Sequence, residues 1–147
     1  METANDPAMD PATAFAAVAL AAVSWDGVLT LAGTRALRHA LDYRPPYKER
    51  SDAQMIALMD ELLAGLRSKG AEGLMQEAAG VLDERQRHTA YAVAAEIMRS
   101  DGPLAEKERQ ILANLASSLA LPPTETDKVL EVMDVLHASI LEPALQA

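Results

Sequence analysis

An internal repeat constrains the fold of this 147-residue chain more than any other feature of its sequence. Two Asp-Gly pairs, Asp26-Gly27 and Asp101-Gly102, lie 75 residues apart. Apolar residues coincide at that offset before and after each pair: Val18, Ala19, Ala22 and Val23 with Val93, Ala94, Ile97 and Met98, then Leu29, Ala36, Leu37 and Ala40 with Leu104, Ile111, Leu112 and Leu115. A register kept across both flanks predicts two helix–turn–helix units that pack against each other about a pseudo-two-fold axis.

The composition favours helix independently of this repeat. Aromatic residues make up only 3% of the chain, while Ala and Leu, which lose little side-chain entropy in a helix, are abundant. We expect a compact all-α single domain over residues 12–147, preceded by a disordered tail at 1–11. Caps and breakers divide it into about seven helices, which start near Ala12, Thr30, Ser51, Ala71, Asp83, Leu104 and Thr124.

Helical periodicity also predicts which faces are buried. The first helix is apolar on all sides, which is typical of a central helix. We expect the helix after Ser51 to turn one apolar stripe inward: Met55, Ile56, Met59, Leu62, Leu63 and Leu66. We expect the last helix to do the same with a second stripe: Val129, Val132, Met133, Leu136 and Ile140.

Charge and cysteine content narrow the class of partner. The formal net charge is −9, and such a chain repels nucleic-acid phosphates and anionic membrane surfaces. The chain has no cysteine, and no Lys or Arg precedes Arg35, so the apolar run Ala14–Val23 lacks the basic flank of a signal peptide. We expect a cytoplasmic protein without a transmembrane segment. Its partners would be cations or proteins, and it would reach a membrane only through a partner.

The Asp-Gly pairs and Glu108 form the first candidate site. Glycine supplies the positive φ that ends a helix, and Asp bonds to neighbouring backbone, so each pair is explained as a turn without any function. Glu108, however, falls on the inward face of its helix, seven residues after Asp101. An inward carboxylate needs a partner. It could accept from backbone N–H groups at its own helix start, pair with Arg99 or Arg109, or bind a hard divalent cation, most naturally Ca²⁺ or Mg²⁺.

Two surface segments offer further readings. Asp127, Glu131 and Asp134 share one outer face of the last helix, which is either a solvated surface or a docking face for a basic partner. The segment DYRPPYKER at 42–50 is the only stretch that combines basic and aromatic residues. It reads first as a connector whose tyrosines pack on nearby helices.

No catalytic constellation accompanies these residues. His39, His88 and His137 are isolated in sequence and lack metalloprotease spacing, and neither a P-loop nor a nucleophile elbow is present. We therefore expect a binding or adaptor protein and no enzyme.

The stretch Ala90–Leu121 resembles the TerB-like tellurite-resistance family. It has an Ala-rich helix, an Asp-Gly turn, a Glu seven residues after the Asp, and a second helix rich in small residues and Leu. The segment around Trp25 resembles the first copy of that unit, with Gly33 in place of the Glu and Ala105 in place of the usual capping residue in the second copy. The resemblance implies a compact helical fold, a stress-response adaptor role, and divalent-metal binding through Asp26, Asp101 and Glu108.

Overall fold

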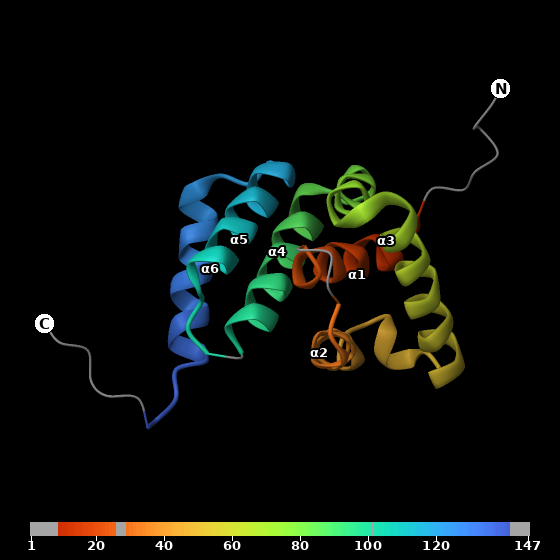
Figure 1. Cartoon of the computed structure of the whole chain (residues 1–147), viewed down its shortest axis with the longest axis horizontal. Coiled ribbons are helices and arrows are strands. Elements are labelled where there is room, and N and C mark those ends of the chain that lie inside the picture. Colours follow the sequence, from red (N-terminus) through yellow and green to blue (C-terminus); the bar gives the residue numbers. More distant parts are fainter. Residues whose placement is uncertain (1–8, 26–28, 101, 142–147) are drawn as a thin grey trace, which may run out of the picture.

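The computed structural model describes residues 9–25, 29–100 and 102–141, and these residues form helices and loops without a strand. The all-α prediction is therefore confirmed. Six α-helices and one short 3-10 helix follow one another along the described chain (Figure 1): α1 (Pro11–Val23), α2 (Leu31–Asp42), η2 (Tyr47–Glu49), α3 (Asp52–Val81), α4 (Glu84–Arg99), α5 (Glu106–Ser118) and α6 (Pro123–Leu136).

Helix α1 is the centre of the core, as its uniformly apolar sequence predicts. Nearly every residue from Thr13 to Ala22 is buried, because α2, α3, α4 and α5 all pack on it. The helix begins one residue before the predicted Ala12. Asp10 is its N-cap, with Oδ1 accepting from the Thr13 N–H at 2.7 Å, and Pro11 occupies the first helical position, where its missing N–H costs nothing.

Helix α3 explains why the predicted count of seven helices is not confirmed. It continues from Asp52 to Val81 as one element, although the backbone at Gly70 leaves the helical region with φ 73° and ψ 169°. Gly70 thus breaks the helix where the sequence predicts a stop. The predicted starts at Ser51 and Asp83 are confirmed, since each residue is the N-cap of a complete capping box.

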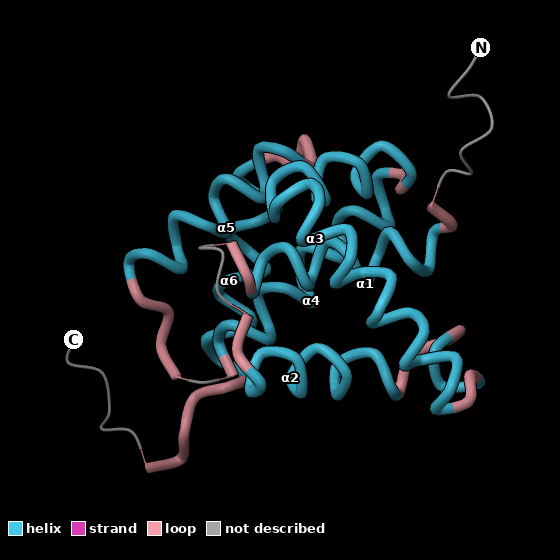
Figure 2. The backbone as a smooth tube through the Cα atoms, turned by 45° about the vertical axis from the view of Figure 1, so that its right-hand side comes forward, coloured by secondary structure: helices cyan, strands magenta, loops and turns pink. Residues whose placement is uncertain are grey.

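The repeat is present in the structure with the register that the sequence predicts. Helices α2 and α5 begin at Leu31 and Glu106, an offset of 75 residues. Helix α1 packs on α4, and the remaining contacts are reciprocal: α1 touches α5 and α2 touches α4. Figure 2 shows α2 running below α1 and α4.

The predicted buried faces are partly wrong for α3 and α6. In α3, Ile56 is 56% exposed, while Leu58 takes its place in the core. In α6, only Val129, Leu130 and Met133 among the apolar residues pack on the core. The predicted members Val132, Leu136 and Ile140 are exposed, because α6 lies at the edge of the molecule and packs chiefly on α4 (Figure 1).

Among the described residues, no helix is long and apolar enough to span a membrane.

Candidate functional site

The two Asp-Gly turns can be followed only at their flanks. Asp26 and Asp101, two of the three predicted metal ligands, lie outside the described residues. In the second turn, Gly102 has φ 131° and donates its N–H to the Arg99 carbonyl at 3.0 Å. This positive φ agrees with the predicted role of glycine in the turn, because glycine adopts it without a steric penalty.

Glu108, the third predicted ligand, is half-buried and caps its own helix. Its Oε1 accepts the backbone N–H of Ala105 at 2.9 Å, which satisfies one of the free donors at the start of α5. Ala105 has no side-chain acceptor to return the bond, so α5 carries half of a capping box. Of the three partners considered for this carboxylate, the structure shows the backbone N–H. Arg99, one of the alternatives, pairs elsewhere.

The first unit carries the other half of the same motif. Thr30 is the N-cap of α2, and its Oγ1 accepts the Gly33 N–H at 2.9 Å. At the 75-residue offset, Thr30 corresponds to Ala105 and Gly33 to Glu108. One unit therefore keeps the capping hydroxyl and the other keeps the capping carboxylate.

Residues next to both turns border a single cavity of about 210 Å³. Trp25 and Thr30 line it from the first unit, and Lys107 and Glu108 line it from the second. Its remaining walls are apolar side chains of α1, α2, α4 and α5. Among the described residues, no group of three or more His, Asp or Glu side chains could hold a metal ion.

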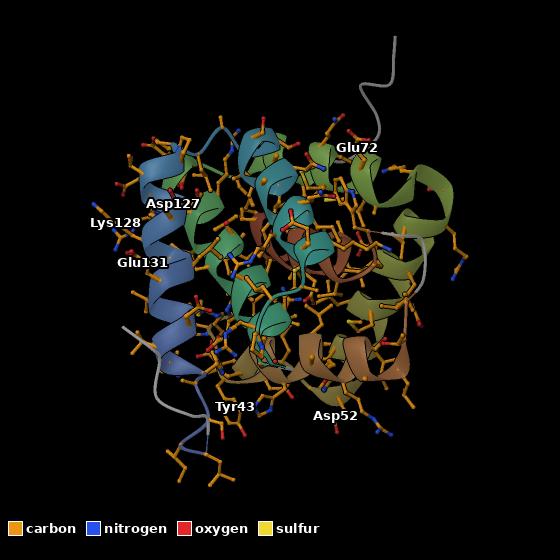
Figure 3. All side chains as sticks on the ribbon, turned by 60° about the vertical axis from the view of Figure 1, so that its left-hand side comes forward. Tyr43, Asp52, Glu72, Asp127, Lys128 and Glu131 are labelled. Carbon is orange, nitrogen blue, oxygen red and sulfur yellow. The ribbon has the colours of Figure 1, made fainter. Side chains whose placement is uncertain are left out.

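The acidic face of α6 is exposed at all three predicted positions, and two of them have no ion-pair partner among the described residues. Asp127 and Glu131 project from the outer side of the helix (Figure 3). Within the part of the chain that the structure describes, neither carboxylate has an ion-pair partner. They leave a negative ridge one helical turn long.

Asp134, the third predicted position, binds a buried arginine. The Arg99 side chain is 4% exposed, and its Nε donates to Asp134 Oδ1 at 2.8 Å. The same guanidinium reaches the carbonyl oxygens of Asp134 and His137 at 3.4 and 3.5 Å. A second pair joins the same helices, with His137 Nε2 3.2 Å from Glu96 Oε2. These contacts join residues 35 to 41 positions apart in sequence, so no local pattern could reveal them.

An exposed apolar patch adjoins the acidic ridge, and the sequence did not predict it. It consists of residues that are 58–98% exposed, which we call the α6 apolar patch: Val132, Val135, Leu136, Ile140 and Leu141. Glu131 precedes Val135 by four residues, so the ridge adjoins the patch residues that lie on α6, while Ile140 and Leu141 follow the end of the helix. Their periodicity suggested a buried stripe, which is why the sequence assigned several of them to the core.

The two tyrosines of the 42–50 connector differ in environment. Tyr47 is buried, and its hydroxyl donates to the Ala12 carbonyl at 2.5 Å, which fixes the connector to the start of α1. Burial raises the pKa of Tyr47. Tyr43 is 77% exposed and touches His39 edge-on. The prediction that the tyrosines of this connector pack on nearby helices is therefore confirmed for Tyr47 alone.

Comparison with protein-family models, with curated proteins and with solved structures finds no match for this chain. Function must therefore be argued from the surface of the molecule itself.

Proposed function

We propose that this chain is a non-enzymatic helical adaptor domain that binds a protein partner through α6. The observation that carries the proposal is the α6 apolar patch, with five large apolar side chains at one edge of the molecule. Exposed apolar clusters with a polar rim mark interaction sites, because leaving them in water is unfavourable. The rim here is negative, through Asp127 and Glu131, so it favours a partner with basic residues around an apolar centre.

The proposal agrees with the role that the TerB-like resemblance implies, namely an adaptor in the response to tellurite or other chemical stress. The reciprocal packing of the two units and the all-helical fold support that resemblance. Loss of the protein should then lower the survival of its host cells on tellurite.

Site-specific photocrosslinking tests the adaptor role. A photoreactive residue at Val135 should give defined crosslinked products in a native lysate. The matched control is Ile56, which is 56% exposed on α3, far from α6 in sequence. Products at Val135 that are absent at Ile56 and disappear in the Asp127→Lys/Glu131→Lys variant would support the proposal. Identical products at both positions would overturn it.

A divalent cation at the Asp-Gly turns is a second proposal, and one observation favours it. Side chains adjacent to both turns border the same 210 Å³ cavity, so a cation there could draw on both units. Against it stands Lys107, a positively charged residue that lines the same cavity.

Thermal unfolding of metal-stripped protein titrated with Ca²⁺, Mg²⁺, Zn²⁺ and Mn²⁺ tests this second proposal. A cation at a hundred times its dissociation constant should add about 2.7 kcal/mol to the free energy of unfolding. Glu108→Gln should remove that gain, since it keeps an acceptor for the Ala105 N–H and loses the charge. A chain that responds to none of the four ions would overturn it.

A further inference from the structure

A pocket of about 260 Å³ lies between the start of α1, the 42–50 connector and the junction of α3 with α4. No residue of α6 lines it, so it is separate from the surface proposed above. Most of its wall is apolar or aromatic: Pro11, Ala12, Phe15, Pro45, Pro46, Tyr47 and Leu82. The two other lining residues are Arg44 and Gln86, and their polar groups determine which ligand the pocket selects.

Arg44 is the charged residue of this wall, and it is already held in place. Its guanidinium carbon lies 5.5 Å from the centre of the Phe15 ring, which is a cation–π contact. Its backbone N–H donates to the Leu41 carbonyl and its own carbonyl accepts from the Lys48 N–H, both at 2.9 Å. Within the described ranges, Arg44 forms no ion pair with a carboxylate. A guanidinium that is positioned before binding loses less conformational entropy when it receives an anion.

Gln86 offers the pocket a second hydrogen-bond donor. Its Oε1 accepts the Asp83 N–H at 2.9 Å in the capping box of α4, so the polar group that remains to it is its NH2. An amide NH2 beside a guanidinium favours a ligand that accepts hydrogen bonds at both, and a carboxylate has two oxygens for that purpose.

The residues that line this pocket include no Asp or Glu. Asp10 and Asp83 adjoin it in sequence, but each carboxylate turns to the start of its own helix. Asp10 accepts the Thr13 N–H at 2.7 Å, and Asp83 accepts the Gln86 N–H at 2.8 Å. The pocket of this chain of net charge −9 thus has a cationic wall, which selects an anion.

The size of the pocket and its apolar wall define the rest of the ligand. A cavity of about 150 Å³ holds one benzene molecule, so about 260 Å³ has room for an aromatic ring with a short acidic side chain. We propose that this pocket binds a small aromatic carboxylate, with its ring against Phe15 and its carboxylate on Arg44 and Gln86. This inference goes beyond the adaptor role and does not depend on it.

An NMR titration of isotope-labelled protein tests the inference. The probe is phenylpropionate, and its control is phenylpropionamide, which has the same shape and no charge. Phenylpropionate should bind saturably and shift the backbone amide signals around Phe15 and Gln86. The amide should bind roughly tenfold more weakly, the equivalent of about 1.4 kcal/mol, because it lacks the charge-assisted hydrogen bonds.

Two arginine variants separate binding in the pocket from general attraction to a basic segment. Arg44→Met removes the charge, keeps an unbranched chain over Phe15, and should weaken binding of phenylpropionate roughly tenfold. Arg50→Met is the matched control, because Arg50 stacks on Tyr47 at 5.6 Å in the same way and does not line the pocket. It should change the affinity by roughly twofold at most, since salt screens charges outside the site.

Two glutamine variants make a second matched pair. Gln86→Glu keeps an acceptor for the Asp83 N–H but places a negative charge in the wall, so it should weaken binding roughly tenfold or more. Gln54 has the same position in the capping box of α3, where its Oε1 accepts the Ser51 N–H at 2.8 Å. Gln54→Glu should therefore bind as wild type does. Unfolding temperatures verify that all four variants are folded.

Three outcomes would overturn the inference. The first is equal affinity for phenylpropionate and phenylpropionamide. The second is an equal loss of affinity in Arg44→Met and Arg50→Met, which would reduce the effect to general attraction. The third is tighter binding of an acetylated tripeptide that ends in a free Phe carboxylate, which would make a chain terminus the occupant. Failure of the adaptor role would appear separately, in the crosslinking at Val135.

Discussion

Completing the capping box of α5 should stabilise the protein. The Ala105 backbone is already in the extended N-cap conformation, with φ −72° and ψ 161°, close to the −93° and 159° of Thr30 in the first unit. Glu108 already supplies the reciprocal bond. Ala105→Ser adds only the missing acceptor for the Glu108 N–H, at an exposed position where a hydroxyl has room.

The magnitude follows from known N-cap energetics. A Ser in place of Ala at an N-cap contributes typically about 1 kcal/mol. In a domain of this size that corresponds to roughly 3 °C in Tm. Thr30→Ala should cost about the same amount, because it removes the equivalent bond to Gly33 in the first unit. Differential scanning calorimetry of the two variants beside wild type measures both shifts.

Glu108 supplies the control for this reasoning. Glu108→Ala should destabilise α5 by about 1 kcal/mol, because it leaves the Ala105 N–H without its partner. Glu108→Gln keeps an acceptor and should cost less, losing only the favourable charge at the helix start. An unchanged Tm in Ala105→Ser together with a neutral Thr30→Ala would refute the assignment of complementary half-caps to the two units.

Three further changes have defined outcomes. Ala120, the residue after the C-cap of α5, has φ 57°, so Ala120→Gly should raise the free energy of unfolding by about 1 kcal/mol in urea titrations. The bond from the Thr13 N–H lowers the pKa of Asp10 below 3.8, so its carboxylate stabilises the fold above about pH 4. That advantage over Asp10→Ala should shrink in acid denaturation as the pH falls through the lowered pKa. Burial raises the pKa of Tyr91 to about 12, so this hydroxyl should lower the free energy of unfolding by about 1.4 kcal/mol per pH unit from pH 10 to 12, in addition to the fall due to Tyr47, and Tyr91→Phe should lack the Tyr91 contribution.

The core helices could be predicted from sequence because the positions of their apolar residues determine which faces must be buried. Helix α1 is apolar all round and has to be enclosed, and α4 presents Val93, Ala94, Ile97 and Met98 on one buried face. Caps at Ser51 and Asp83 act through residues three positions away, so local sequence fixes those boundaries.

Helix α6 shows where that reasoning stops. Its apolar residues have helical spacing, yet periodicity measures amphipathicity and does not reveal whether a neighbour covers the apolar face. Val132 and Leu136 are apolar at the predicted spacing and still face water. Asp134 was predicted to lie on an outer face, and its side chain is half-exposed. Its partner Arg99 is 35 residues away in sequence, so this ion pair could be found only in the folded chain.

The candidate metal site was ambiguous from sequence for a different reason. A Glu at the third helical position serves a capping box by default, and a cation stayed open as the alternative because Ala105 cannot complete that box. The structure shows that half a capping box suffices to occupy one oxygen of Glu108. Asp26 and Asp101 lie outside the described residues, so the cation stays a prediction.

Arg99 ends α4 immediately before the second turn, and its buried guanidinium is bonded to the final turn of α6. One side chain thus links a loop to the edge of the molecule that carries the α6 apolar patch. If both proposals hold, a cation at the turn that shifted Arg99 would change the affinity of α6 for its partner, and the partner would change the affinity for the cation by the same factor.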